Sequence, residues 1–317
     1  WLKHSSWPLP DSLASVETEG MDRSSLRSQF LESEVVRNPS LAVNELFSVM
    51  DKVALVTGGS RGIGLMIAKG LVENGARVYI SARKTDVCDK VAADLARMGP
   101  GTCHSLPGDE LNTDAACRSL AAKLAEKEEK LHILVNNAGA TWGGAFEDFP
   151  DHAWGKIMSL NVASIFNLTR ACYPMLKKAT GGSMDPAHVI NIGSTAGHPM
   201  ANVFDNAPSY HASKAAAAQV TRWLAAKFCR EGINVNCIQP AVFPSKMTYD
   251  YMLKTEHGDE MAMRSHPVGR YGHEKDMVGL AIFLASRASA FVTGSAIGCD
   301  GGMAHIQGAE RLPLPKL

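Results

Sequence analysis

The 317-residue chain lacks an excess of charge of either sign. Its 32 Lys and Arg residues equal its 32 Asp and Glu residues, so net charge gives no reason to expect a nucleic acid or an anionic membrane as partner. No apolar run approaches the ~20 residues of a membrane-spanning helix, and no membrane span is expected.

Patterns for disulfides and metal ions are also missing. The seven cysteines are scattered, and no Cys-x-x-Cys pair occurs. This usage is typical of reduced thiols and predicts an intracellular, cytoplasmic protein. The histidines show no metal-ligand spacing such as His-Glu-x-x-His, so no metal site is expected.

Residues 1–46 differ in composition from the rest of the chain. They are rich in Ser and lack a sustained apolar period, and acidic residues outnumber basic ones. The acidic balance argues against a mitochondrial transit peptide, and there is no hydrophobic signal core, although organellar targeting stays open. We expect a flexible extension over 1–46 with one short helix near 24–36, a single domain over 47–303, and a tail over 304–317.

From residue 46 onward, short apolar runs alternate with longer amphipathic segments. The runs cover 53–56, 78–80, 133–135, 189–192 and 233–238, and the segments between them include 63–74, 88–97, 114–129 and 157–177. Such alternation predicts β-α-β units with right-handed crossovers. We therefore expect an α/β fold in which one doubly wound, Rossmann-type parallel sheet lies between two helical layers.

A Gly-rich segment, Thr57-Gly58-Gly59-Ser60-Arg61-Gly62-Ile63-Gly64, joins the first apolar run to the first amphipathic segment. The context of strand, tight turn and helix start predicts dinucleotide binding. Gly58 permits the turn, Gly62 lets a pyrophosphate approach, and Gly64 permits close packing of helix on strand. Backbone N–H groups at the helix start then face the phosphates.

Tyr210 and Lys214 lie four positions apart at the start of an alanine-rich run with high helix propensity. Positions i and i+4 share one face of a helix, so an ammonium lies beside a phenol. A free phenol has a pKa of about 10 and transfers protons poorly near neutral pH, whereas a neighbouring positive charge stabilises phenolate. The pair suits proton transfer to or from an alcohol or carbonyl oxygen, although this spacing alone also fits an ordinary surface pair.

The Gly-x3-Gly-x-Gly loop and the Tyr–Lys pair together resemble the short-chain dehydrogenase/reductase family over residues 50–303. Three further motifs support the resemblance: Asn136-Asn137-Ala138-Gly139, Asn191-Ile192-Gly193-Ser194 and Asp300-Gly301-Gly302. The resemblance implies that Ser194 binds the substrate carbonyl, that Tyr210 transfers the proton, and that Lys214 holds the nicotinamide ribose. It also implies that Asn161 supports a water in a proton relay.

The end of the second predicted strand indicates which nicotinamide cofactor is used. NAD-dependent enzymes usually place Asp or Glu there for the ribose 2′-hydroxyl, whereas this chain has Ala82 followed by Arg83 and Lys84. Because no carboxylate repels a 2′-phosphate and Arg83 can pair with one, NADP(H) is expected. The resemblance gives the adenine contact to Asp109, with an uncertainty of one residue because Glu110 follows. Its remaining cofactor contacts are Gly58, Ser60, Arg61, Gly62, Ile63, Gly64, Asn137, Ala138, Gly139, Tyr210, Lys214, Pro240, Phe243 and Ser245.

Residues 140–143, 191–194 and 243–248 resemble a narrower group, the 3-oxoacyl-[acyl-carrier-protein] reductases that include the rhamnolipid-pathway reductase. This implies NADPH-dependent reduction of a small carbonyl substrate, a 3-oxoacyl thioester on acyl carrier protein or CoA, or a similar β-keto compound. A secondary alcohol, steroid or polyketide dehydrogenase would share the catalytic residues and differ in Trp142, Phe146, Phe204 and the lid over 247–264. A non-catalytic NADP-sensing protein is the alternative of another class, and the complete catalytic set argues against it.

The lid over 247–264 has an adaptable apolar face rich in Met and Tyr, which fits either acyl-chain contact or a surface hairpin packed on the body. The family commonly assembles through the two helices that carry Asn161 and Tyr210. We therefore expect a homotetramer or a homodimer, in which the small side chains of 215–218 would allow close helix approach.

Overall fold

The structure is a computed structural model that describes residues 40–182, 184–199, 206–249, 260 and 263–306. Its contacts divide the chain into two units, Trp1–Glu45 and Leu46–Leu317. The helix expected near 24–36 lies outside the described residues, and the short helix α2 (Val43–Leu46) crosses the division. The domain bounds set at 46 and 303 remain predictions, although the first lies one residue from this division.

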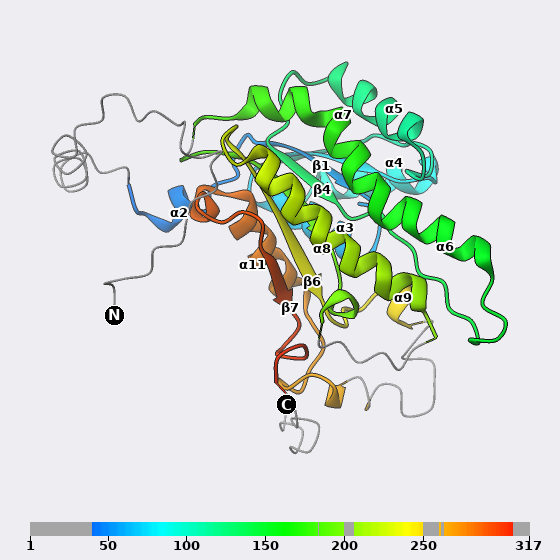
Figure 1. Cartoon of the computed structure of the whole chain (residues 1–317). Coiled ribbons are helices and arrows are strands. Elements are labelled where there is room, and N and C mark those ends of the chain that lie inside the picture. Colours follow the sequence, from blue (N-terminus) through cyan, green and yellow to red (C-terminus); the bar gives the residue numbers. More distant parts are fainter. Residues whose placement is uncertain (1–39, 183, 200–205, 250–259, 261–262, 307–317) are drawn as a thin grey trace, which may run out of the picture. The chain divides into compact units, whose positions relative to one another are not determined.

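A seven-stranded parallel sheet forms the middle layer of the second unit (Figure 1). Its strands are β1 (Val53–Thr57), β2 (Arg77–Ser81), β3 (Thr102–Ser105), β4 (Ile133–Asn136), β5 (Ala187–Ile192), β6 (Ile233–Pro240) and β7 (Ala296–Cys299). The order β3-β2-β1-β4-β5-β6-β7 reverses direction between β1 and β4. The carboxyl ends of strands at such a switch point form the crevice where open α/β sheets bind ligands.

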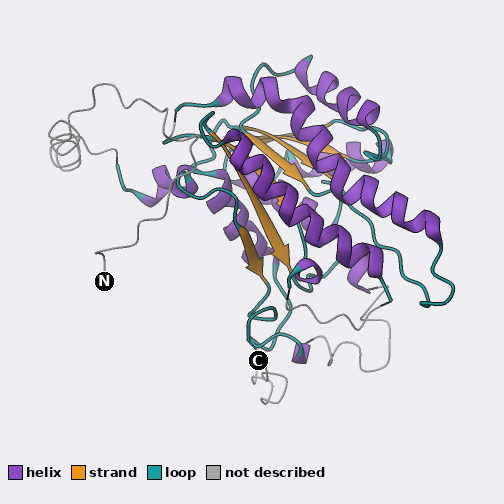
Figure 2. Cartoon of the chain, viewed as in Figure 1, coloured by secondary structure: helices purple, strands orange, loops and turns teal. Residues whose placement is uncertain are grey.

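Helices cover both faces of this sheet (Figures 1 and 2). On one face, α3 (Gly62–Glu73), α4 (Thr85–Leu95) and α11 (Glu274–Ala285) pack with inward strand residues such as Ala54 and Val56. On the other, α5 (Asp114–Ala125), α7 (Ser164–Ala179) and α8 (Pro208–Phe228) pack with the alternate residues Val53 and Leu55. The doubly wound, three-layer fold expected from the sequence is confirmed.

The predicted strands and helices were mostly placed correctly because the central strands are buried on both faces and read as continuous apolar runs. Two strands, β3 and β7, were not among those runs. β3 is short, and its sequence Thr-Cys-His-Ser alternates between exposed or half-buried polar residues and a single buried cysteine. β7 is only partly buried. Both lie at edges of the sheet, where an apolar run is not required.

The helix predicted over 157–177 is interrupted, which corrects that expectation. α6 (Asp151–Met158) leads into a π-helical turn, η2 (Ser159–Ala163), which continues as α7; Figure 1 shows α6 and α7 running on from one another. An amphipathic pattern with the helical period cannot reveal such a turn. Single π-helical turns often occur at functional sites, and this one carries Asn161.

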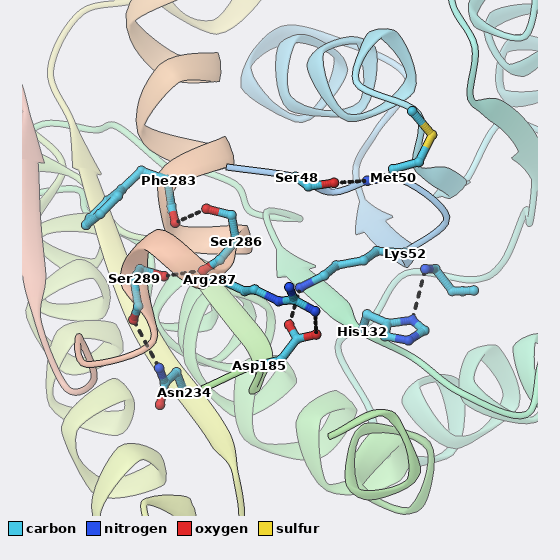
Figure 3. A network of polar contacts seen from close by, with 11 residues as sticks. Ser48, Met50, Lys52, His132, Asp185, Asn234, Phe283, Ser286, Arg287 and Ser289 are labelled. Carbon is cyan, nitrogen blue, oxygen red and sulfur yellow. Dashed lines mark hydrogen bonds and ion pairs between the residues drawn. The ribbon is translucent and has the colours of Figure 1, made fainter. Parts of the chain in front are cut away.

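Charged side chains hold the amino-terminal edge of the sheet (Figure 3). The carboxylate of Asp185, just before β5, binds Lys52 Nζ at 2.9 Å and Arg287 Nη2 at 3.0 Å. Lys52 precedes β1, and Arg287 begins the short helix η5 (Arg287–Ser289). These ion pairs therefore join the starts of β1 and β5 to the helix η5, at the end of the sheet opposite the predicted site.

None of the helices in the described part of the chain is long and apolar enough to span a membrane. Among the same residues, no group of three or more His, Cys, Asp or Glu side chains is placed to hold a metal ion. All seven cysteines are unpaired.

Candidate active site

The Gly-rich turn after β1 adopts backbone conformations that favour glycine, as expected for a tight turn. Gly58 and Gly62 have φ angles of +64° and +55°, in the left-handed region that favours glycine. A Cβ on Gly64 would lie 2.4 Å from Asn137 Nδ2 and 2.5 Å from the Gly58 carbonyl oxygen. The first turn of α3 therefore lies directly on the strand ends. Arg61 at its N-cap makes no side-chain cap, so the first N–H groups remain available to an anion.

Thr57, the last residue of β1, joins this turn to the Asn-Asn-Ala-Gly turn after β4. Its hydroxyl oxygen accepts the N–H groups of Asn137 and Ala138, both at 3.0 Å. The same hydroxyl donates to the Val135 carbonyl at 3.2 Å, and Asn137 Nδ2 donates to the Thr57 carbonyl at 2.8 Å. Thr57 was not predicted as a site residue, although a hydroxyl residue directly before Gly58 is a signal that can be found in the sequence.

Asn161 is almost fully buried and bridges the loop after β4 to helix α8. Its Oδ1 accepts the Ala140 N–H, and its Nδ2 donates to the Ala140 carbonyl, both at 2.9 Å. Nδ2 also donates to Ser213 Oγ at 2.9 Å, and Ser213 Oγ donates to the Tyr210 carbonyl at 2.7 Å. Asn161 is thus not a surface residue of a helix, and it fixes the backbone on both sides of the site.

Ser194 follows β5 and begins the short 3-10 helix η3 (Thr195–Gly197). Its Oγ accepts the Ala196 N–H at 3.1 Å. His211 Nδ1 lies 2.8 Å from the Ala196 carbonyl oxygen, and because a carbonyl only accepts, this nitrogen carries the hydrogen. A Cβ on Gly197 would lie 2.4 Å from the carbonyl carbon of Lys214. The turn that carries Ser194 is therefore packed on the backbone of α8, and neither His211 nor Gly197 was predicted as a site residue.

Tyr210 and Lys214 share one face of α8, as their spacing predicted. Lys214 is only 6% exposed, and its Nζ lies 5.5 Å from the centroid of the Tyr210 ring. Nζ also donates a hydrogen bond to the Ile192 carbonyl oxygen at 2.8 Å. Since a surface lysine would not be buried in this way, the interpretation as an ordinary surface pair does not fit the structure.

Arg83 and Glu110 form an ion pair at the ends of the adjacent strands β2 and β3. Arg83 Nη1 lies 2.9 Å from Glu110 Oε1. Asp109 is exposed, whereas Leu111 is buried and Glu110 is half-buried between them. Glu110 therefore faces Arg83, while Lys84 is an exposed N-cap of α4. Arg83 was predicted at the 2′-phosphate, and Glu110 was considered only as the alternative to Asp109 at the adenine, so their contact was not expected.

The segment after β6 approaches the Gly-rich turn from the other side. Pro240 ends β6, and Ser245 lies so close to Gly62 that a Cβ there would be 3.5 Å from Ser245 Cβ. Ser245 caps the short helix α9 (Lys246–Thr248) by accepting the Thr248 N–H at 3.2 Å. The Phe243 side chain is buried, and its carbonyl accepts from Thr248 Oγ1 at 2.7 Å. Ser245 therefore lies beside Gly62, the residue predicted to let a pyrophosphate approach, and its own contact with the cofactor remains a prediction.

The predicted substrate side is described only in part. Trp142 lies in the loop after β4, with its ring 5.1 Å from that of His152 and 5.4 Å from Lys156 Nζ. Phe146 is 88% exposed. Phe204 and residues 250–259 and 261–262 of the predicted lid lie outside the described residues. Trp142 is thus held by two side chains of α6, at the same end of the sheet as Ser194 and Tyr210.

Comparison with known proteins extends these observations. The family model described as enoyl-(acyl carrier protein) reductase matches residues 58–304. The chain is 45% identical to the rhamnolipids biosynthesis 3-oxoacyl-[acyl-carrier-protein] reductase of Pseudomonas aeruginosa, over 81% of this chain and 97% of the relative. It is 33% identical to the short-chain dehydrogenase/reductase PhomF of Diaporthe leptostromiformis, over 83% and 95%.

Solved structures give the same picture. The Pseudomonas aeruginosa RhlG/NADP active-site complex is 44% identical, with a TM-score of 0.77, over 82% of this chain and 98% of that one. A gluconate 5-dehydrogenase from Burkholderia cenocepacia in complex with NADP and tartrate is 27% identical, with a TM-score of 0.75, over 84% and 100%. The chain therefore belongs to the short-chain dehydrogenase/reductase family.

Proposed function

We propose that this protein is an NADPH-dependent carbonyl reductase that acts on a 3-oxoacyl thioester, carried on acyl carrier protein or CoA, or on a similar β-keto compound. The observation that carries the proposal is the packing of the Ser194 turn directly onto the backbone of Lys214, one helical turn from Tyr210. The named activity of the 45% identical relative supports the 3-oxoacyl thioester as substrate class.

Hydrogen-bond directions support a role for each of these residues in reducing a carbonyl. The Ser194 oxygen already accepts the Ala196 N–H, so its own hydrogen is free to be donated to the substrate oxygen. Tyr210 would give its proton to the same oxygen as negative charge develops there. Lys214 donates one N–H to the Ile192 carbonyl, and its two other N–H groups could donate to the hydroxyls of the nicotinamide ribose.

Asn161 would act mainly by position. Both of its Nδ2 hydrogens are used by Ala140 and Ser213, which fixes the loop after β4 against α8. Its Oδ1 accepts one N–H, from Ala140, and retains a second lone pair for a water of a proton relay.

The cofactor site fits NADP(H). Gly58 and Gly62 present no side chain at the turn before the first N–H groups of α3, and Ser245 lies beside Gly62. Arg83, with Arg61 and Lys84, supplies positive charge for a 2′-phosphate. When bound, NADPH supplies the hydride. Both solved relatives named above contain NADP, which supports this choice.

Assembly and location are further parts of the proposal. Trp223 on α8 is 56% exposed and contacts Phe166 of α7, with ring centroids 5.8 Å apart. An exposed tryptophan packed on the half-buried Phe166 supports a homodimer or homotetramer formed through α7 and α8. The scattered, unpaired cysteines support a reducing compartment such as the cytoplasm.

A second candidate is dehydrogenation of a secondary alcohol, steroid, polyketide or sugar acid by the same residues. It is favoured by the similarity to a gluconate 5-dehydrogenase, since enzymes of the family share their chemistry and differ around the substrate.

NADPH oxidation by the full chain tests these alternatives. The substrates would be acetoacetyl thioesters of CoA and of acyl carrier protein, crotonyl-CoA as a C=C substrate, and a panel of ketones that includes 5-ketogluconate. We expect the acetoacetyl thioesters to have the highest kcat/KM and crotonyl-CoA to be inert. A higher kcat/KM for 5-ketogluconate or another ketone would replace the thioester as the proposed substrate. If a folded, NADPH-binding protein turned over no carbonyl, the proposal that it is a reductase would be wrong.

A further inference from the structure

We propose that Glu110 is a specificity-determining residue: it holds Arg83 in the free enzyme, and the 2′-phosphate of NADP(H) displaces it. By competing for Arg83, Glu110 lowers the affinity for NADP(H) and leaves the affinity for NAD(H) unchanged. The proposal rests on the NADP(H) dependence proposed above.

The topology brings both side chains to one place. β2 and β3 are neighbours, with Ile80 paired to Ser105. Their pairing continues beyond the strands, because Leu106 N–H donates to the Ile80 carbonyl at 2.9 Å and Gly108 N–H to the Ala82 carbonyl at 3.3 Å. Arg83 and Glu110 therefore emerge from adjacent strand ends at the carboxyl edge of the sheet.

This place adjoins the Gly-rich turn. Gly59 N–H donates to the carbonyl of Ser81, the last residue of β2, at 3.2 Å. A nucleotide whose pyrophosphate lies on that turn would extend its adenosine ribose over the ends of β2 and β3. The Arg83–Glu110 pair spans the two strand ends at which the 2′-phosphate would arrive.

Glu110 is held in its orientation by its neighbours. The next residue, Leu111, is 5% exposed, and its side chain anchors this segment in the core. Glu110 Oε1 lies 2.9 Å from Arg83 Nη1, and Asn112 Nδ2 donates to Oε2 at 3.4 Å. Both carboxylate oxygens thus face N–H groups, and the adjacent carboxylate, Asp109, is exposed.

The ion pair can exchange partners. The Arg83 side chain is 61% exposed and that of Glu110 is 26% exposed, and such solvent-accessible pairs are weak. A phosphate monoester carries nearly two negative charges near neutral pH, and a guanidinium binds phosphate bidentately. Phosphate therefore displaces the carboxylate, which then lies close to another anion and repels it. A cofactor without the phosphate leaves the pair closed.

The consequence is faster exchange of a cofactor that carries the phosphate in both redox states. The Glu110 carboxylate repels the 2′-phosphate of NADP⁺ and that of NADPH equally. Release of product limits turnover in many enzymes. With Glu110 present, the site binds the 2′-phosphate less tightly than it would with Arg83 alone, and this favours release of the oxidised cofactor.

Binding of adenosine fragments tests this without catalysis. Calorimetric Kd values would be measured for 2′,5′-ADP and 5′-AMP with wild type, Glu110→Gln, Arg83→Ala and the double variant. Glu110→Gln keeps an amide oxygen for Arg83 and removes the charge. We expect it to bind 2′,5′-ADP roughly three- to fivefold more tightly, the range that one exposed ion pair allows. We also expect 5′-AMP affinity to be unchanged, and the gain to shrink when Arg83 is Ala and when salt is raised.

Asp89→Asn is the matched control, since it removes an exposed carboxylate on the neighbouring helix α4 that has no expected contact with the cofactor, and it should change 2′,5′-ADP binding less than twofold. The role of Glu110 would be overturned if Glu110→Gln bound 2′,5′-ADP no more tightly than the wild type, or if its affinity for 5′-AMP rose by the same factor. Neither outcome would affect the NADP(H) assignment. Preference of the wild type for 5′-AMP over 2′,5′-ADP would instead overturn the NADP(H) assignment, and this proposal with it.

Discussion

A Cβ added to Gly197 would lie only 2.4 Å from the carbonyl carbon of Lys214. This contact joins the two halves of the proposed catalytic apparatus, because Gly197 ends the turn that Ser194 begins and Lys214 lies one helical turn after Tyr210. The distance between the serine and tyrosine hydroxyls is therefore set by backbone packing on α8.

A side chain at position 197 should separate those halves. Gly197→Ala places its Cβ against the backbone of Lys214 and Ala215, which cannot yield as a side-chain end would. We expect a loss of about 1–3 kcal/mol in the free energy of unfolding, as for other overpacked sites, and at least a tenfold fall in kcat. Urea denaturation and NADPH oxidation measure the two effects.

Gly279→Ala is the control for this change. Gly279 lies on the exposed side of α11, where the added Cβ would meet no atom within 4 Å beyond the backbone of its own helix. It should gain about 0.5–1 kcal/mol from helix propensity and keep its activity. A Gly197→Ala enzyme as active as the Gly279→Ala enzyme would contradict the packing argument.

His211 should support catalysis through the Ala196 carbonyl. His211→Phe removes the donor, and a typical hydrogen bond contributes about 0.5–1.5 kcal/mol, so a severalfold fall in kcat is expected as the Ser194 turn loosens. His211→Asn keeps an N–H donor near Nδ1 and should restore most of the rate. Equal rates for the two variants would show that the hydrogen bond has no part in positioning Ser194.

Asn161→Asp tests the bridge between the loop after β4 and α8. A carboxylate cannot donate to the Ala140 carbonyl or to Ser213, so both lose a partner that they have in the folded protein. We expect a cost of about 1–3 kcal/mol for the buried groups left unpaired, and loss of most activity. Ser213→Ala, which removes one of these partners, should show a smaller change in thermal unfolding; the reverse order would contradict the bridge.

His188 should make stability depend on pH. Burial, and then the charge of Lys52, lower the pKa of His188 to about 3, and neither ring nitrogen has a hydrogen-bond partner. The unfolded chain binds a proton below its pKa of about 6.5, whereas the folded protein does so only near pH 3. Stability from this residue is therefore complete above pH 6.5 and is lost as pH falls towards 3, by about 1.4 kcal/mol per unit.

Urea unfolding at several pH values between 4 and 7 measures this slope. His188→Leu removes the titrating group and should unfold with a shallower dependence on pH than the wild type. Parallel curves for the two proteins would contradict the assignment.

Trp223→Glu tests the proposed assembly through α7 and α8. A charge in place of this exposed ring should shift the mass measured by light scattering towards the monomer. Met98→Glu, at a 50% exposed position after α4, is the control and should leave the mass unchanged. An unaltered mass for Trp223→Glu would place the interface elsewhere.

Local motifs allowed much of this architecture to be predicted from sequence, and tertiary contacts account for what was missed. The close approach at Gly64 follows from spacing within a single turn, and β4 or β5 follows from an apolar run buried on both faces. The Arg83–Glu110 pair joins residues 27 positions apart, and nothing in either local sequence indicates it. His211 and Gly197 were passed over for the same reason, since their roles depend on η3 lying against α8.

The rate of NADPH oxidation by Tyr210→Phe with acetoacetyl-CoA tests the central claim most directly. If the Tyr210 hydroxyl is the proton donor, the variant should bind NADPH like the wild type and react at least about 100-fold more slowly, the range for general acid catalysis. A variant that keeps the wild-type rate would contradict the account.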